Sequence, residues 1–218
     1  MRNIKLILPI GFLLIILFYF LTGCPVTPTH LEIKNLLDST PIEENSSLFV
    51  ADLDTGVISF ETNDTKYSGE YGYTLWSQDD IVQDPFTHLN VTLKKISGND
   101  VAGYGVVFGS HDDTMLVVLI DTKKSFIIGE LTGNVFTELQ PWTNSPNLIQ
   151  GYNQENTIDI SYNSGTGDYS LSFNGQMPVP FRDDDEPFHM TGKSGYIVVI
   201  SPLDNFPNIP VSVTFKKN

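Results

Sequence analysis

Carboxylates are the side chains of this sequence best suited to chemistry, and they occur in three short runs. The runs are Asp79-Asp80, Asp112-Asp113 and 183–186, each beside residues typical of turns. Carboxylates that lie close together can act as general acid and base, or as oxygen ligands of a hard cation such as calcium. Consecutive strand residues point to opposite faces, however, and acids in loops are usually solvated. We therefore expect no cofactor, with calcium as the one alternative left open.

Aromatic side chains offer a second chemistry, because flat rings stack against the C–H faces of sugars. Trp142 and Tyr152 lie in a long predicted loop that is rich in Asn, Gln and Pro. Together with His111 and Asp112 from a neighbouring predicted turn, they form our predicted ligand rim, since imidazole and carboxylate groups bond to hydroxyls. Packing at the edge of the core is the alternative for both rings. The same two interpretations apply to the aromatic stretch that ends at Trp76.

Other catalytic motifs are missing from the sequence. The four histidines lack the spacing of metal ligands, and there is no Gly-x-Ser-x-Gly elbow. Gly192-Lys193-Ser194 is not a phosphate-binding loop, because the earlier glycine that this motif requires is replaced by Pro187. No catalytic residue and no metal ligand is predicted, and a non-enzymatic role is favoured.

The only cysteine, Cys24, follows an apolar run at the N-terminus. Arg2 and Lys5 precede sixteen uncharged residues, which would make a helix of only about 24 Å against a hydrocarbon core of roughly 30 Å. This layout is typical of a secretory signal rather than of a membrane span. A lone cysteine also excludes an intramolecular disulfide.

The residues Leu21-Thr22-Gly23-Cys24 resemble the lipobox of bacterial lipoproteins. The resemblance implies cleavage before Cys24, a diacylglycerol on its thiol and a further acyl chain on the new amine. Two or three acyl chains make a stable anchor. Pro25 stands where enteric lipoproteins kept in the inner membrane have Asp, which implies the outer membrane or the cell surface. An uncleaved helix with a free cysteine is the alternative.

The net charge of −14 at pH 7 restricts the partners. Removal of the signal takes away two basic residues and makes the chain still more acidic. Such a charge argues against nucleic acid and against electrostatic docking on anionic lipid. Aromatic residues make up 11% of the chain, which is unlike the composition of disordered proteins.

Composition divides the chain into three parts. Residues 1–23 are the predicted lipoprotein signal peptide. Residues 24–47 hold the lipidated cysteine and a flexible tether with three prolines and many Ser, Thr and Asn. Residues 48–218 form one domain, long enough to bury a substantial core.

Within the domain the hydrophobic period is two. The stretches 87–95, 157–162 and 168–173 alternate apolar and polar residues, as half-buried strands do. The run 115–120 is apolar on both sides, which predicts a central strand covered on both faces. No stretch after the signal shows a helical stripe. We predict an all-β sandwich of roughly eleven to thirteen short antiparallel strands.

The order of motifs along residues 57–216 resembles the concanavalin A-like lectin/glucanase jelly roll. Four motifs follow one another: a Gly-x-Val-Phe strand at 105–108, the segment Trp142-Thr-Asn-Ser, the strand opened by Asn156-Thr-Ile and the Asn174-Gly175 turn. The laminin-G-like and DUF1080-like branches are most similar. The resemblance implies a jelly-roll β-sandwich of two antiparallel sheets, in a group whose members bind glycans, act on glycans or serve as structural domains.

Glucanases of this fold carry their catalytic carboxylates on one strand as Glu-x-Asp-x-x-Glu, and no such spacing occurs here. We therefore expect a membrane-anchored envelope lipoprotein that binds a glycan or an envelope protein without catalysis. A DUF1080-like glycan hydrolase and a purely structural or adhesive domain are the alternatives.

Overall fold

The structure is a computed structural model that describes residues 40–78, 87–111, 113–182 and 191–218. Cys24 and Asp112 lie outside the described residues. The described residues form fourteen strands and two short 3₁₀ helices, η1 (Ser46–Leu48) and η2 (Thr65–Tyr67). Neither of these helices has the length or the apolar character needed to cross a bilayer.

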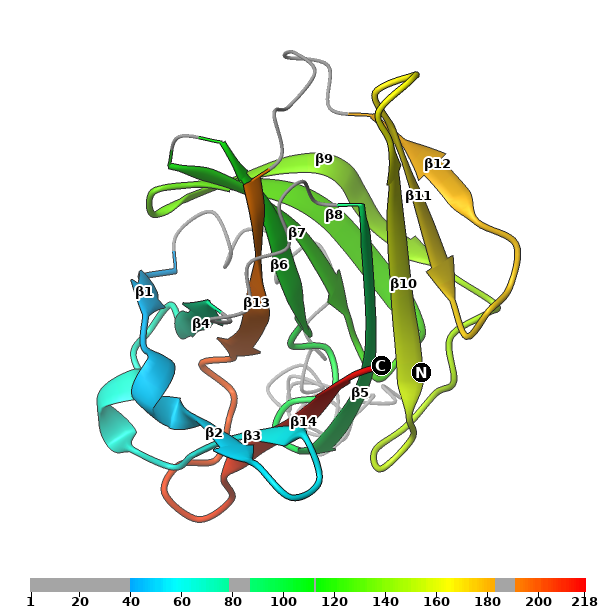
Figure 1. The fold of residues 1–218 in the computed structure, drawn as a ribbon. Coiled ribbons are helices and arrows are strands. Elements are labelled where there is room, and N and C mark those ends of the chain that lie inside the picture. The colour runs from blue at the N-terminus through cyan, green and yellow to red at the C-terminus, as the bar shows by residue number, and fades with distance from the viewer. Residues whose placement is uncertain (1–39, 79–86, 112, 183–190) are drawn as a thin grey trace, which may run out of the picture.

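Two seven-stranded sheets face each other (Figure 1). Sheet A has the order β1 (Ile42–Glu44), β4 (Tyr73–Gln78), β13 (Thr191–Ile200), β6 (Tyr104–His111), β7 (Thr114–Ile120), β8 (Ser125–Thr132) and β9 (Val135–Asn144). Sheet B has the order β12 (Val179–Phe181), β11 (Asp168–Phe173), β10 (Asn156–Asn163), β5 (His88–Ser97), β14 (Val211–Lys217), β3 (Val57–Thr62) and β2 (Phe49–Asp52). Neighbouring strands are antiparallel except β1 and β4, which are parallel. The predicted all-β sandwich is confirmed.

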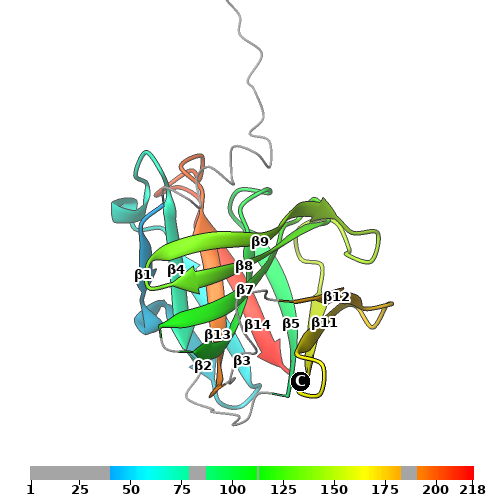
Figure 2. The same cartoon turned by 90° about the horizontal axis from the view of Figure 1, so that it is seen from above.

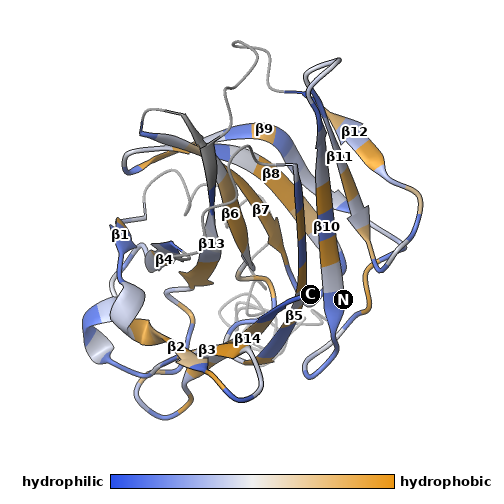
Figure 3. Ribbon diagram, in the orientation of Figure 1, coloured by the Kyte–Doolittle hydropathy of each residue, from blue (hydrophilic) through white to orange (hydrophobic). Residues whose placement is uncertain are grey.

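The main core lies between the sheets, and strand β7 shows how alternation builds it. One set of its side chains packs with residues of sheet B, and the other set packs on the outer face of sheet A, which is turned away from sheet B. The inner set is Leu116, Val118 and Ile120, and the outer set is Met115, Val117 and Leu119. The prediction of a central strand covered on both faces is therefore confirmed. Figure 3 shows the same apolar character along β6, β7 and β8.

The outer face of sheet A forms a second apolar core because the sheet curls over it. Phe136 of β9 lies over Gly129 of β8, so closely that a methyl group on Gly129 would be 2.2 Å from the ring. Asn134, in the turn between these strands, donates to the carbonyl oxygen of Ile42 at 3.2 Å when its amide is oriented to satisfy both groups. Figure 2 shows the β8–β9 turn beside β1. The two edges of sheet A thus meet around the second core.

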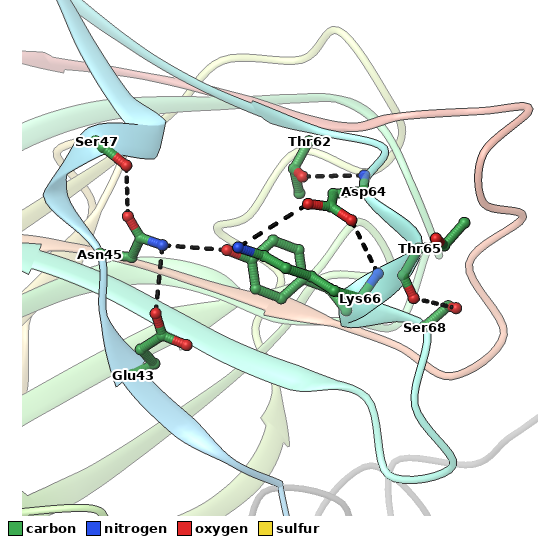
Figure 4. Close-up of polar contacts among 9 residues, drawn as sticks. Glu43, Asn45, Ser47, Thr62, Asp64, Thr65, Lys66 and Ser68 are labelled. Carbon is green, nitrogen blue, oxygen red and sulfur yellow. Dashed lines mark hydrogen bonds and ion pairs between the residues drawn. The ribbon is translucent and has the colours of Figure 1, made fainter.

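Residues 40–47, which the sequence assigned to the tether, are part of the fold. Ile42 is buried in the second core, and β1 pairs with β4. The segment that follows is fastened by side chains (Figure 4): Asn45 donates to the hydroxyl of Tyr67 at 3.1 Å and accepts from Ser47 at 2.7 Å. The folded domain therefore reaches back to about Thr40.

A buried lysine connects the loops at one end of the sandwich. The ammonium of Lys95, on β5, donates to the carbonyl oxygens of Asn99 at 2.6 Å and Ala102 at 2.8 Å. Burial lowers the pKa of Lys95 to about 8, an effect opposed by nearby carboxylates, of which Asp204 is the strongest. Asp204 accepts hydrogen bonds from the backbone N–H groups of Asn99 and Ser201. Lys95 thus holds the loop after β5, and Asp204 joins that loop to the loop after β13.

Candidate functional site at the edge of sheet A

A cavity of about 340 Å³ lies where β4 ends and β7 begins. Strands β1, β4, β7 and β13 contribute to its lining, together with the β6–β7 and β8–β9 turns. Its volume falls at the lower end of the range of small-molecule sites. The lining combines two apolar residues with amides, acids and an amine: Trp76, Met115, Gln78, Asn134, Glu44, Asp113 and Lys193. We call this cavity the Trp76 pocket.

Trp76 is the anchor of the pocket. Strand alternation turns it to the outer face of sheet A, between Glu44 of β1 and Ile197 of β13. Its side chain is only 8% exposed, and among the described residues its indole N–H has no hydrogen-bond partner. Buried indole N–H groups usually find an acceptor. A ligand oxygen in the pocket could supply one.

The polar groups around Trp76 are positioned by the same strand geometry. Gln78 lies two residues further along β4 and so shares the face of Trp76. Within the described part of the chain, the nitrogen of its amide has one hydrogen-bond contact, with the sulfur of Met115 at 4.0 Å, and sulfur is a weak acceptor. Glu44, Asp113 and Lys193 are exposed at the mouth. The pocket therefore offers both donors and acceptors to an entering molecule.

The described strands lack the one-strand acid spacing of the glucanases. Apart from Glu43 and Glu44, which are consecutive and so point to opposite faces, each described strand carries at most one acid. Within the described parts of the chain, no three His, Cys, Asp or Glu side chains lie close enough to hold a metal ion. The runs Asp79-Asp80 and 183–186 lie outside these parts, so the prediction of no cofactor is untested there and calcium stays the alternative.

A second hollow, of about 310 Å³, lies on the outer face of sheet B. Its polar groups already bond to one another: Lys94 pairs with Glu155 at 3.3 Å, and Asn218 donates to Thr92 at 2.9 Å. Thr92 also shares a hydrogen bond with Thr157. Since these groups satisfy each other and no exposed ring lines the hollow, the Trp76 pocket is the better candidate site.

The predicted ligand rim is not brought together. Trp142 lies on β9 over Gly103, just before the start of β6, whereas His111 ends β6, about 25 Å of strand away. Tyr152 lies in the β9–β10 loop and donates its hydroxyl to the carbonyl oxygen of Gly98. Asp112 lies outside the described residues, although the turn to which it belongs borders the Trp76 pocket through Asp113.

Trp76 is in an aromatic stretch of the sequence but was not among the residues of the predicted ligand rim. The signal was present in the alternation of Thr74, Trp76 and Gln78, which puts an indole and an amide on one face. Glu44 was missed because the residues around it were assigned to the tether. The hairpin that carries Asn134 is more than fifty residues from Trp76, Gln78 and Lys193.

Comparisons with known proteins give the fold. No protein-family model and no curated protein matches the chain. Among solved structures, a GH16 enzyme for mixed-linkage glucan from Bacteroides ovatus, in complex with a product, has a TM-score of 0.53 at 11% identity, over 83% of this chain and 90% of that one. A β-glucanase from Bacillus licheniformis has a TM-score of 0.52 at 9% identity, over 82% and 86% of the two chains.

A third solved structure, described as a native glycosidic hydrolase, is similar to the same extent: its TM-score is 0.52 at 9% identity, over 80% of this chain and 82% of that one. The predicted concanavalin A-like jelly roll is confirmed at the level of the fold. The narrower resemblance to the laminin-G-like and DUF1080-like branches stays a prediction. At such low identities the likeness establishes architecture alone.

Proposed function

We propose that this protein is a lipid-anchored envelope protein whose jelly-roll domain binds a glycan without cleaving it. The observation that carries the glycan part is Trp76. A buried indole whose N–H has no partner among the described residues lines a cavity that also holds Met115, amides, acids and an amine. Glycan-active neighbours of the same fold support this choice of ligand class by analogy.

The pocket suits a single sugar unit, such as the end of a chain or a branch. The apolar atoms of Trp76 and Met115 can contact the C–H groups of a sugar ring. The indole N–H and the amide of Gln78 can donate to hydroxyls, while the carboxylates of Glu44 and Asp113 can accept from them. The small volume favours one sugar over an extended chain lying along the sheet.

We propose a non-catalytic role because of the side chains on the outer face of sheet A. On this face its central strands β7 and β8 carry Val117, Leu119 and Ile127, all completely buried, and no carboxylate. A retaining glycosidase needs two carboxylates about 5 Å apart, and an inverting one needs them roughly 6.5 to 9.5 Å apart. The acids of the pocket instead lie exposed at its mouth, on β1 and on the β6–β7 turn.

A glycan array tests the proposal, with the mature chain applied in the presence and absence of calcium. We compare two matched variants, Trp76→Phe and Trp142→Phe, each of which removes one indole from the outer face of sheet A. Binding of one sugar class that is lost in Trp76→Phe and kept in Trp142→Phe supports the pocket. Loss in Trp142→Phe alone would move the site to the predicted ligand rim.

Two other results would contradict the proposal. Release of reducing ends from the bound glycan would make the protein a hydrolase. A blank array from a folded protein would favour a structural role or an envelope protein as the partner.

The anchor is proposed from Cys24 and the lipobox resemblance. Cys24→Ala should leave the chain uncleaved or release it from the membrane fraction, because both lipidation and cleavage require the thiol. Mass spectrometry of the wild-type N-terminal peptide should show the acyl chains. Membrane attachment of Cys24→Ala equal to that of the wild type would count against the anchor.

A further inference from the structure

Exposed apolar side chains gather at one end of the sandwich. In the described residues ten large hydrophobic side chains are exposed, and six of them lie in or beside four loops at this end. The four loops are residues 68–72, 96–102, 145–153 and 201–210. The six side chains are Tyr71, Ile96, Ile149, Tyr152, Leu203 and Ile209, between 38% and 57% exposed. We call this end the Thr40 end.

Hydrogen bonds between the loops hold them side by side at the Thr40 end. Tyr152 donates to Gly98, which joins the loop after β9 to the loop after β5. Ser97 donates to the carbonyl oxygen of Pro210 at 2.6 Å, and Asp204 accepts from the backbone of the same loop. Because three loops are joined in this way, their apolar side chains share one surface.

The chain enters the described domain at the same end. The hydroxyl of Thr40 donates to the carbonyl oxygen of Tyr71 at 3.0 Å. Gly72 next to it packs against Ile200 and Pro202, at the start of the fourth loop. In Figure 2 the loops around 63–72 and 201–210 lie together at the top, and the 52–57 turn lies at the bottom.

The Trp76 pocket lies toward the opposite end. Strand β4 begins at Tyr73, opposite Ile200, and ends at Gln78, opposite Gly195. These six residues run from the Thr40 end to the pocket. The described chain therefore begins at the Thr40 end of the sandwich, and the Trp76 pocket lies toward the other end.

We propose that the Thr40 end lies against the lipid bilayer, with its exposed aromatic and aliphatic side chains at the headgroup level. The inference rests on the proposed lipid anchor at Cys24. Fifteen residues lie between Cys24 and Thr40, and the distance from one to the other is at most about 55 Å even when the chain is fully extended. Attachment over so short a distance gives an effective concentration in the millimolar range. A weak contact is then enough to hold this surface on the membrane.

The chemistry of the surface selects a zwitterionic bilayer. Tyr, Leu and Ile side chains at loop tips enter the interface without a basic patch, as interfacial anchors do. The protein carries a net charge of −14, and the four loops hold Glu70, Asp100 and Asp204 but no lysine or arginine, although Asp100 pairs with Lys123 of the neighbouring turn at 2.5 Å. Anionic lipid would repel such a surface. The orientation that follows directs the Trp76 pocket away from the membrane.

The single cysteine allows a test that does not depend on lipidation in the cell. The mature chain is coupled through Cys24 to maleimide-bearing lipid in phosphatidylcholine vesicles. Leu203→Trp places a tryptophan at the Thr40 end, and Leu53→Trp places one in the opposite turn, where the side chain is 93% exposed. Brominated phosphatidylcholine quenches tryptophan only on contact with the lipid. Trp76 and Trp142 give the same background in both variants.

We expect at least a twofold greater quenching in Leu203→Trp than in Leu53→Trp. Ile209→Trp provides a second position at the Thr40 end if the first variant folds poorly. Equal quenching at the two ends, or none at either Thr40-end position, would overturn the inference. The lipid anchor in cells is judged separately by the fractionation of Cys24→Ala, so failure of one proposal is distinguishable from failure of the other.

Discussion

The ammonium of Lys95 donates to the carbonyl oxygen of Ala102 across 2.8 Å, at a position where the lysine has no exposed surface. Lys95→Met would leave this carbonyl and that of Asn99 without a donor and would remove the cation that faces Asp204. We expect the free energy of unfolding to fall by about 2 to 4 kcal/mol. Urea denaturation measures the change.

The neighbouring Lys94→Met is the matched control for this experiment. Lys94 points to solvent and pairs with Glu155, an exposed ion pair that should contribute less than about 1 kcal/mol. Equal losses in the two variants would show that the buried ammonium has no special role.

The same lysine predicts a dependence of stability on pH. Burial lowers the pKa of Lys95 to about 8 in the folded state, against an ordinary lysine pKa of 10.5 in the unfolded chain. Between these values the unfolded state binds more protons, so the contribution of Lys95 to the free energy of unfolding rises with pH. We expect the difference between wild type and Lys95→Met to grow by about 1 kcal/mol per pH unit above pH 8. A difference that stays flat from pH 8 to pH 10 would contradict the lowered pKa.

Gly129→Ala should destabilise the second core. The new methyl group would lie 2.2 Å from the ring of Phe136 and must displace it. We expect a loss of about 1 to 3 kcal/mol in thermal or urea unfolding. Gly69→Ala is the control, since nothing lies within 4 Å of its added methyl group, and its effect should stay within about 0.5 kcal/mol.

Ile42→Ala tests whether residues 40–47 belong to the domain. Ile42 is buried in the second core, so its truncation should cost about 2 to 4 kcal/mol. Val50→Ala, on the exposed edge strand β2, should cost little. If the two variants unfold at the same urea concentration, β1 is not part of the cooperative unit.

Gln78→Leu probes the proposed sugar site without touching Trp76. Loss of the amide should weaken binding of the array-identified sugar about tenfold, as measured by calorimetry. Thr92→Val changes the hollow on sheet B by an isosteric step and should leave the affinity unchanged. The reverse result would place the sugar on sheet B.

Strands were the most predictable part of the fold. The alternation in 87–95, 157–162 and 168–173 corresponds to β5, β10 and β11, because each of these strands has one face on the main core and one in solvent. Strand β1 was not predictable, since its three residues are too few to show a period and only its pairing with β4 makes it a strand.

The burial of Lys95 shows what the alternation of a strand can predict and what it cannot. Leu89, Val91, Leu93 and Lys95 share one face of β5, so alternation alone points the lysine inward. Its charge argues for the surface. The two carbonyl oxygens that settle the matter come from the following loop, whose conformation no local pattern specifies.

The Trp76 pocket was less predictable than the fold because sheet A has to curl before the pocket exists. The contact between Asn134 and Ile42 joins segments more than ninety residues apart. Trp142 and Tyr152 were favoured because the sequence predicts one long loop for both, yet Trp142 lies on β9, near the end of β6 opposite to His111. Position along the strand, which the sequence does not display, decides which residues meet.

The parallel pairing of β1 with β4 has a mechanical consequence. If the protein is held at its N-terminus by the membrane and at its pocket by a fixed glycan, tension runs along the strands. Strand β1 would then be pulled lengthwise against β4, so that its ladder is loaded in shear and its hydrogen bonds must break together. An edge strand peeled from the other direction would give way one bond at a time. The pairing of β1 with β4, the two shortest strands of sheet A, is thus oriented to resist a force that pulls on the N-terminus.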